Sequence, residues 1–351
     1  MGTFAGTTYG LYKAEKKAVI ILPGLFASGL YDSETNEPIW DPFEHIDKEF
    51  GDFMNSEGDI LIDNIVPLAF DTEVVGQLNK ILANNNEGAE DSLFNIMAMN
   101  EDGTPAVSSV TGVPWEREGR LKYGAINAQK GMYESLYERY GEDYAVEIFN
   151  YDFRLDNRYN AELLEKHINK KGYNDIILVS HSNGGHVAAI YLARSQDNRD
   201  KVTKYISYNA PYMGSFSAIS IMENIDGMLA GVSEITDSVP PLLQNMVNRI
   251  VNNVEELFDK QFKKLLNMWT VYHLLPNFDL LSQEYNGEQA AIYIDGDRKI
   301  FEDEVELWEF YCSRPWARHQ NGDLKPAMAN WLEYVNSLKV TLPSGEKVYS
   351  P

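Results

Sequence analysis

The chain contains little cysteine, few basic residues and no long apolar run. Its 351 residues include one cysteine, Cys312, so neither an internal disulfide nor a cysteine-based metal site can form. The 30 Lys and Arg against 53 Asp and Glu give a net charge of -23 at pH 7, which disfavours nucleic acid and anionic membranes as partners. Any lipid contact must therefore be hydrophobic and local. We see no segment of membrane-spanning length and no signal-peptide pattern at the amino terminus, and the compartment and oligomeric state stay open.

Apolar segments of strand length alternate with segments of helical periodicity. The hydrophobic content of 44% is ample for a buried core. Strands are predicted at residues 18–22, 145–149, 176–179 and 202–208, and helices at 125–140 and 161–168. This alternation predicts an α/β fold with right-handed crossovers, a mostly parallel sheet and helices on both of its faces.

Ser182 stands between an apolar strand and a segment that favours a helix. The run 179–186 reads Val-Ser-His-Ser-Asn-Gly-Gly-His, with small residues two before and two after Ser182. A tight strand-to-helix turn needs small residues there, although Ser180 replaces the usual first glycine. Such an elbow exposes a hydroxyl for nucleophilic chemistry, whereas a plain strand-ending turn is the alternative interpretation.

We expect residues 1–351 to form one domain with two insertions. The first insertion covers residues 31–123 and includes a predicted helix at 73–82. The second covers 216–275 and carries an amphipathic helical pattern typical of a lid or cap, or simply of core packing. Residues 276–351 are predicted to be a helical region that leads into a strand.

Four segments stand out by their order along the chain: residues 20–28, 149–154, the Ser182 elbow and 207–215, with Leu274-Leu275-Pro276 as a weaker fifth. Together they resemble one family of α/β-hydrolases, that of lecithin:cholesterol acyltransferase and its phospholipase relatives. The resemblance implies an α/β-hydrolase fold. It also implies a serine esterase, phospholipase or acyltransferase that acts on lipid acyl esters. A peptidase or thioesterase is a weaker alternative.

The resemblance assigns roles around the elbow. Ser182 would attack an ester carbonyl and form an acyl-enzyme. The backbone N–H groups of Asn183 and Leu25 would hold the oxyanion. Asp152 and Arg154 would form an ion pair that braces a neighbouring loop, and Trp40 would line an acyl-binding wall or belong to the core. Serine acyl transfer requires no cofactor, and the sequence contains no metal-ligand cluster.

The base and acid that should activate Ser182 are harder to find. In this fold they follow the serine, in the order Asp then His. Five of the six histidines are poorly placed: His45 and His167 precede the elbow, His181 adjoins Ser182, His186 lies one helical turn after it, and His273 falls in the expected lid. His319 remains, with Asp295 or Asp297 as its acid.

The resemblance favours another solution for the acid and base. The segment 343–349 resembles the family's entry to the sheet strand that carries the acid, and Lys347–Tyr349 would be that strand. Both groups would then lie beyond Pro351, and the sheet would lack its last strand or strands. The chain would then be part of a truncated or split enzyme. The third alternative is a non-catalytic α/β-hydrolase-like binding module that has lost both groups.

Overall fold

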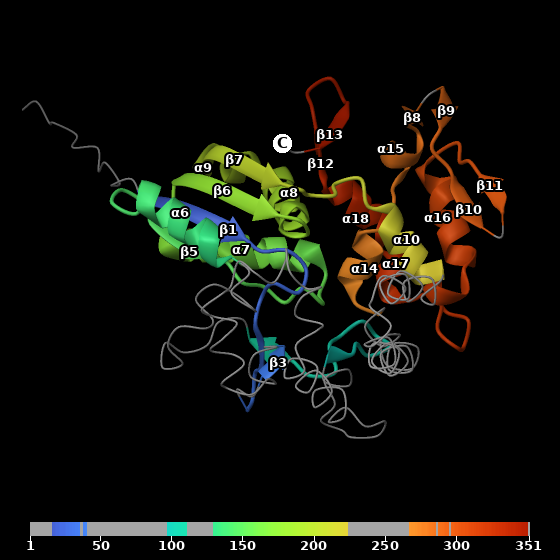
Figure 1. Ribbon diagram of the computed structural model, residues 1–351, viewed down its shortest axis with the longest axis horizontal. Coiled ribbons are helices and arrows are strands. Elements are labelled where there is room, and N and C mark those ends of the chain that lie inside the picture. The colour runs from blue at the N-terminus through green and yellow to red at the C-terminus, as the bar shows by residue number, and fades with distance from the viewer. Residues whose placement is uncertain are drawn as a thin grey trace, which may run out of the picture.

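Four parallel strands form the central sheet of the computed structural model (Figure 1). The structure describes residues 16–35, 38–40, 97–110, 129–223, 267–285, 287–294 and 296–349. The sheet order is β5-β1-β6-β7, with β1 at Lys17–Leu22, β5 at Ala145–Ile148, β6 at Asp175–His181 and β7 at Val202–Tyr208. Every neighbouring pair is parallel, so the predicted strands and the parallel sheet are confirmed.

Helices cover both faces of this sheet, as the alternation predicts. On one face α6 (Lys130–Tyr140) packs on Val19 and Ile21 of β1. On the other face Ala18, Ile20 and Leu22 pack with α7 (Asn157–Lys171) and α8 (Gly184–Arg194), and α9 (Gln196–Lys201) then leads into β7. Successive β1 side chains therefore point to opposite faces, and both faces are buried. This is an α/β fold of the kind that the resemblance to α/β-hydrolases implies.

The predicted helices are present with different bounds. The described part of the 125–140 helix begins at Lys130, and residues 125–128 lie outside the described residues. The 161–168 helix is longer and covers Asn157–Lys171. The carboxylate of Asp156 accepts a hydrogen bond from the Arg158 amide at its start, and Gly172 ends it with a φ of 73°.

The connections that leave β1 and β6 run toward opposite edges of the sheet. From β1 the chain crosses to β5 on one side, whereas β6 is followed by β7 on the other side. The carboxyl ends of β1 and β6 lie side by side, since Leu22 pairs with Ser180. Such a switch point leaves a crevice at the carboxyl edge of a parallel sheet, where active sites form. Here it brings the loop after Leu22 next to Ser182.

Parts of both expected insertions are described. In the first, β2 (Leu30–Asp32) pairs antiparallel with β3 (Pro38–Trp40) and with β4 (Ser109–Val110). The helix predicted at 73–82 lies outside the described residues. In the second, only α10 (Phe216–Glu223) and residues 267–275 are described, so most of the expected lid is outside them as well. No helix in the described ranges is long and apolar enough to cross a membrane.

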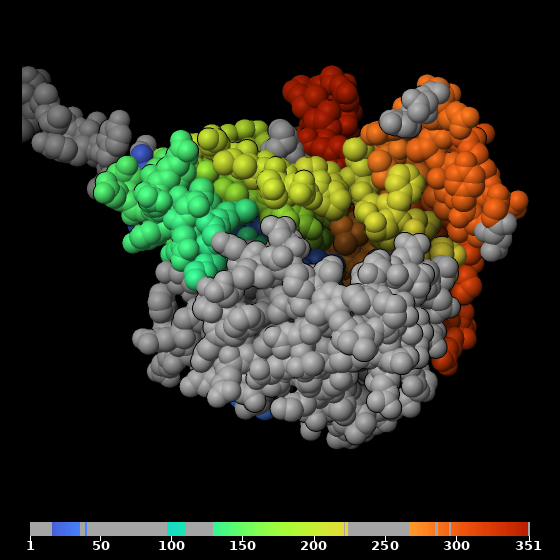
Figure 2. Space-filling view, viewed as in Figure 1, coloured from blue at the N-terminus to red at the C-terminus, as the bar shows by residue number. Residues whose placement is uncertain are grey.

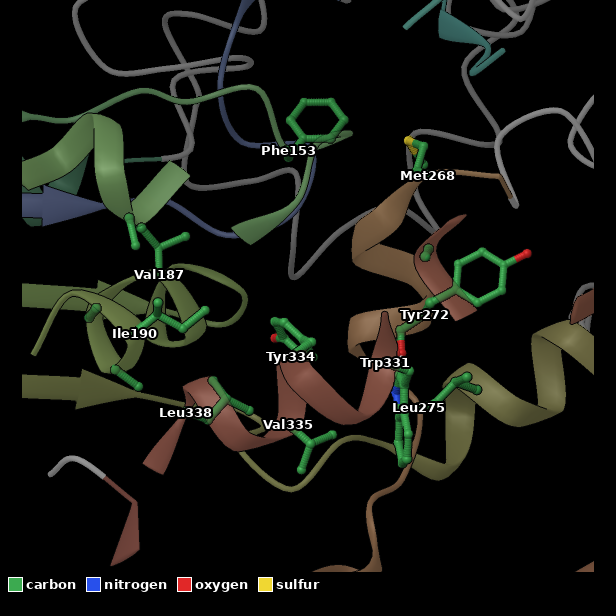
Figure 3. Packing of buried hydrophobic residues seen from close by; sticks show 14 of the residues in the cluster. Phe153, Val187, Ile190, Met268, Tyr272, Leu275, Trp331, Tyr334, Val335 and Leu338 are labelled. Atoms are coloured by element: carbon green, nitrogen blue, oxygen red, sulfur yellow. Dashed lines mark hydrogen bonds between the residues drawn. The ribbon is translucent and has the colours of Figure 1, made fainter. Parts of the chain in front are cut away.

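Helices from the C-terminal part of the chain pack against α7 and α8. α14 (Trp269–His273) ends the second expected insertion, and it is followed by α15 (Phe278–Leu281), α16 (Glu304–Ser313), α17 (Pro326–Ala329) and α18 (Trp331–Ser337). Figure 3 shows α18 between two groups of helices, with Tyr334 and Leu338 toward Val187 and Ile190 of α8 and Trp331 toward the α14 side. The indole of Trp331 is fully buried and donates to the Tyr272 carbonyl at 3.1 Å.

Three antiparallel hairpins in this region were not anticipated. They are β8 (Glu284–Tyr285) with β9 (Glu288–Gln289), β10 (Ile292–Ile294) with β11 (Asp297–Lys299), and β12 (Lys339–Thr341) with β13 (Lys347–Tyr349).

The expectation for residues 347–349 was half right. They form a strand, but β13 pairs with β12 in a hairpin that projects from the surface (Figure 2) and does not join the parallel sheet. Gly345 turns the chain with a φ of 88°. Five residues, 342–346, can connect antiparallel strands, whereas a parallel connection requires a crossover of about a dozen or more.

Candidate active site

Ser182 has the backbone conformation of a nucleophile elbow. Its φ is 50°, in the left-handed region that a non-glycine residue rarely adopts. Its amide donates to the carbonyl oxygen of Tyr208 at 3.0 Å, which ties the turn to the end of β7. The residue is partly exposed, so the strained turn presents its hydroxyl at the carboxyl edge of the sheet.

Glycines allow the chain to approach itself on three sides of Ser182. A β-carbon at Gly184 would collide with the carbonyl oxygens of Leu22 and Pro23, lying 2.7 Å from the latter. A β-carbon at Gly185 would overlap the side chain of Ala210, and one at Gly24 would lie 3.0 Å from the Ser182 β-carbon. The sequence predicted the need for small residues after Ser182, and these contacts supply its physical reason.

Two backbone amides near the elbow, those of Asn183 and Leu25, have no acceptor among the described residues. Asn183 begins α8, whose amino end carries partial positive charge, and Leu25 lies in the loop that follows β1. Within the described residues neither amide donates a hydrogen bond to another protein group.

A buried polar layer fixes these two segments relative to each other. The hydroxyl of Tyr151 donates to the Pro23 carbonyl at 2.6 Å and accepts from the Asn183 side chain at 3.1 Å. The amides of Asn183 and Asn157 exchange two hydrogen bonds, at 2.9 and 3.2 Å. Sequence reasoning missed Tyr151 and Asn157 as site residues, although Tyr151 lies inside the matched 149–154 segment.

Aromatic rings support the loop that carries Leu25. Phe26 has a φ of 62°, and its carbonyl accepts a hydrogen bond from the indole of Trp40 at 2.7 Å. The Phe26 ring contacts Trp40 and Phe153, with centroid distances of 5.4 and 5.0 Å. Trp40 thus supports this loop through a directed hydrogen bond, and none of its contacts with described residues assigns it to an acyl-binding wall.

Asp152 and Arg154 form a buried ion pair on the same side of the sheet. Arg154 is fully buried, and its Nη2 lies 2.7 Å from an oxygen of Asp152. Arg154 also donates to the Val107 carbonyl at 3.0 Å, and Asp152 accepts from the Ser109 hydroxyl at 2.6 Å. The pair therefore joins the end of β5 to the described part of the first insertion.

Two histidines lie behind the elbow in an aromatic stack. Nε2 of His186 donates to the Pro211 carbonyl at 2.7 Å, so Nδ1 of the neutral ring accepts from Tyr334 at 2.6 Å. The Tyr334 ring stacks on His273 at 3.5 Å, and His273 lies 3.8 Å from Asp156. Burial lowers the pKa of His186 to about 4 and that of His273 to about 3. Both rings are packed in the interior.

The family model described as lecithin:cholesterol acyltransferase matches residues 132–307, which include the elbow. The chain belongs to the lecithin:cholesterol acyltransferase family. Among curated proteins, none matches the chain. A solved structure titled "The crystal structure of Tle4-Tli4 complex" has 15% identity and a TM-score of 0.38, covering 92% of this chain and 70% of that one.

Family membership indicates a lipid acyltransferase or esterase, but the described residues do not bring the predicted acid and base to Ser182. His319 lies in a turn whose backbone bonds to Asp323, and it lines a small crevice with Trp269 and Lys325. Asp297 is exposed on the β10–β11 hairpin, far from the end of β6 (Figure 1). Asp295 lies outside the described residues.

His181 adjoins the nucleophile at the end of β6. The His181 ring is half-buried and lies 5.9 Å from the ring of Tyr208, and burial lowers its pKa. In the described part of this family member no imidazole is hydrogen-bonded to the Ser182 hydroxyl, and no group of three His, Cys, Asp or Glu side chains could hold a metal ion.

Proposed function

We propose that Ser182 is the nucleophile of an acyl-transfer reaction on lipid esters. The observation that carries this proposal is the strained elbow, with its φ of 50°, at the switch point of the sheet between two free amides. Family membership supports the lipid acyl ester as the substrate class.

The chemistry proceeds in two halves. In the first, the Ser182 hydroxyl loses its proton to a base, its oxygen bonds to the ester carbonyl carbon, and the C–O bond to the alcohol breaks as that alcohol takes up the proton. In the second, water or another alcohol releases the acyl group in the same way. In both halves the carbonyl oxygen becomes an oxyanion, which the amides of Leu25 and Asn183 stabilise.

The base and its acid come from residues that the structure does not describe beside Ser182. The pair His319 with Asp297 is less suited, because Asp297 is remote from the elbow. In this proposal Asp152 and Arg154 brace the loop and take no part in the chemistry, since their polar atoms are used by each other and by residues 107–109.

Product analysis with phospholipid vesicles tests this function. Vesicles with and without a long-chain alcohol are incubated with the protein, and free fatty acid is separated from newly formed ester. We expect acyl release that falls to background in Ser182→Ala and persists in Ser344→Ala, an exposed serine on the β12–β13 turn. Equal release by wild type and Ser182→Ala would refute the proposal. A parallel incubation with an acyl thioester identifies a thioesterase, which would cleave the thioester in preference to the phospholipid ester.

The alternative function is a non-catalytic binding module of the same fold. The observation that favours it is that no described histidine bonds to the Ser182 hydroxyl. Vesicle binding without any acyl release, unchanged in Ser182→Ala, is the result expected of such a module.

A further inference from the structure

Ser180 is the one position of the elbow that departs from the usual glycine, and its side chain is fully buried. The proposed chemistry does not use it. Ser180 lies directly opposite Ser207 of β7, and Leu178 lies opposite Tyr205. Side chains alternate along a strand, so Ser180, Tyr205 and Ser207 belong to the face of the sheet that α8 covers.

Four hydroxyl groups form a continuous chain on this face. The Ser180 hydroxyl lies 2.8 Å from that of Tyr205, which lies 2.6 Å from that of Tyr212. Tyr212 in turn donates to the Ser207 hydroxyl at 2.6 Å. This hydroxyl chain thus joins β6, β7 and the loop that follows β7.

Counting protons gives the chain a direction. Each hydroxyl has one hydrogen to donate. Tyr212 uses its hydrogen on Ser207, so it must accept from Tyr205, and Tyr205 must accept from Ser180. Ser180 is therefore the donor that starts the chain. Burial also raises the pKa of Tyr205, which keeps its proton in place.

The hydroxyl chain lies next to the first turn of α8. A β-carbon at Gly185 would lie 3.4 Å from the Tyr212 hydroxyl, in addition to its overlap with Ala210. Ser182 itself is tied to the same region, because its amide donates to the carbonyl of Tyr208. The elbow is consequently held to β7 at two points: the Ser180 hydroxyl bonds to Tyr205, and the Ser182 amide bonds to Tyr208.

We propose that Ser180, Tyr205 and Tyr212 are positioning residues, which hold the Ser182 elbow against β7 in place of the usual glycine. This inference rests on the proposed function only where fluorophosphonate labelling of Ser182 is the readout. Removing the Tyr205 hydroxyl leaves a buried donor on Ser180 without an acceptor, and such an orphan is more disruptive than the loss of both partners.

Four variants test the chain through the rate at which a fluorophosphonate labels Ser182. We expect Tyr205→Phe to label about tenfold more slowly, equivalent to about 1.4 kcal/mol. Ser180→Gly should have a smaller effect. The double variant should label faster than Tyr205→Phe alone, because the orphaned donor is gone. Tyr293→Phe is the matched control, since Tyr293 is 63% exposed on a distant hairpin.

Equal rates for wild type and Tyr205→Phe would overturn the inference, and so would additive effects of the two substitutions in the double variant. Urea midpoints of all variants are measured in parallel. If adding Ser180→Gly to Tyr205→Phe does not restore the labelling rate, the loss is assigned to general destabilisation, which also counts against the inference.

A second readout separates this inference from the proposed function. In Ser182→Cys the rate of alkylation by iodoacetamide reports how residue 182 is held at the amino end of α8, where a thiolate is favoured. Site-resolved mass spectrometry distinguishes it from the buried Cys312. We expect Tyr205→Phe to slow this alkylation at least about threefold relative to Tyr293→Phe. If wild type is not labelled by the fluorophosphonate but Tyr205→Phe slows the alkylation of Cys at position 182, the proposed function alone is refuted. If Tyr205→Phe leaves the alkylation rate unchanged, the positioning role is refuted.

Discussion

Gly184 lies directly against Pro23, because a β-carbon at residue 184 would approach the Pro23 carbonyl oxygen to 2.7 Å. This contact joins the first turn of α8 to the loop after β1. The two segments carry the amides of Asn183 and Leu25, so the distance between the two proposed oxyanion donors depends on a residue without a side chain.

Gly184→Ala should therefore disrupt the site. Overpacking against backbone that cannot rotate away is expected to cost about 1–3 kcal/mol of unfolding free energy and to slow labelling of Ser182. Gly131→Ala is the matched control, since nothing lies within 4 Å of its β-carbon position in α6. Alanine there should stabilise by about 0.5–1 kcal/mol. Urea denaturation of both variants checks the prediction, and a neutral Gly184→Ala would contradict it.

Ser182→Gly should separate stability from reactivity. A left-handed conformation costs a non-glycine residue about 1–2 kcal/mol, and the greater freedom of glycine in the unfolded chain offsets about 0.5–1 kcal/mol of that gain. We expect net stabilisation of about 0.5–1 kcal/mol together with complete loss of labelling. Ser220→Gly, on an exposed position of α10, should instead destabilise slightly. If both variants lost stability equally, the elbow would not be strained.

The buried ion pair gives a prediction about stability alone. Arg154→Met leaves the Asp152 carboxylate buried without its charged partner, which is expected to cost about 3–5 kcal/mol. Lys166→Met removes an exposed i,i+4 partner of Glu162 and should produce no measurable loss. Thermal and urea unfolding compare the two, and similar small effects would show that Arg154 does not brace the loop.

Buried histidines make stability depend on pH. Because the folded-state pKa values of His186 and His273 are lowered, the unfolded chain binds protons below about pH 6.5 that the folded protein excludes. Their contribution is fully present above that pH. It falls by about 1.4 kcal/mol per histidine and pH unit down to about pH 4 for His186 and about pH 3 for His273.

His273→Phe tests this dependence, because the His273 ring stacks on Tyr334 and has no hydrogen-bond partner among the described residues. We expect nearly unchanged stability at pH 7 and a slope between pH 6 and 4.5 that is shallower by about one proton. Unfolding free energies measured across this range decide the question, and an unaltered slope would be inconsistent with a neutral buried His273.

Local patterns predicted the sheet and the elbow well. Strand β7 was predicted with its observed bounds, and the small residues around Ser182 predicted a turn that the structure contains. These features depend on apolar runs and on glycines near one another in the sequence, where periodicity and steric needs can be read directly.

Contacts between distant segments could not be predicted in this way. The Tyr334–His186 hydrogen bond joins residues 148 positions apart, and the Tyr205–Ser180 bond depends on strand register. Strand β13 was assigned to the wrong sheet because its sequence does not reveal its partner, which a short turn at Gly345 determines. The hydrogen-bonded layer of Tyr151 and Asn157 was missed for the same reason.

Fluorophosphonate labelling with peptide-level mass spectrometry tests the assignment of Ser182 most directly. The protein, its Ser182→Ala variant and its Ser344→Ala variant are treated alongside an active serine hydrolase. We predict a phosphonate adduct on the peptide that contains Ser182 in wild type and Ser344→Ala, and no adduct in Ser182→Ala. An unlabelled Ser182 while the reference hydrolase labels, or an adduct on another serine that persists in Ser182→Ala, would contradict the account.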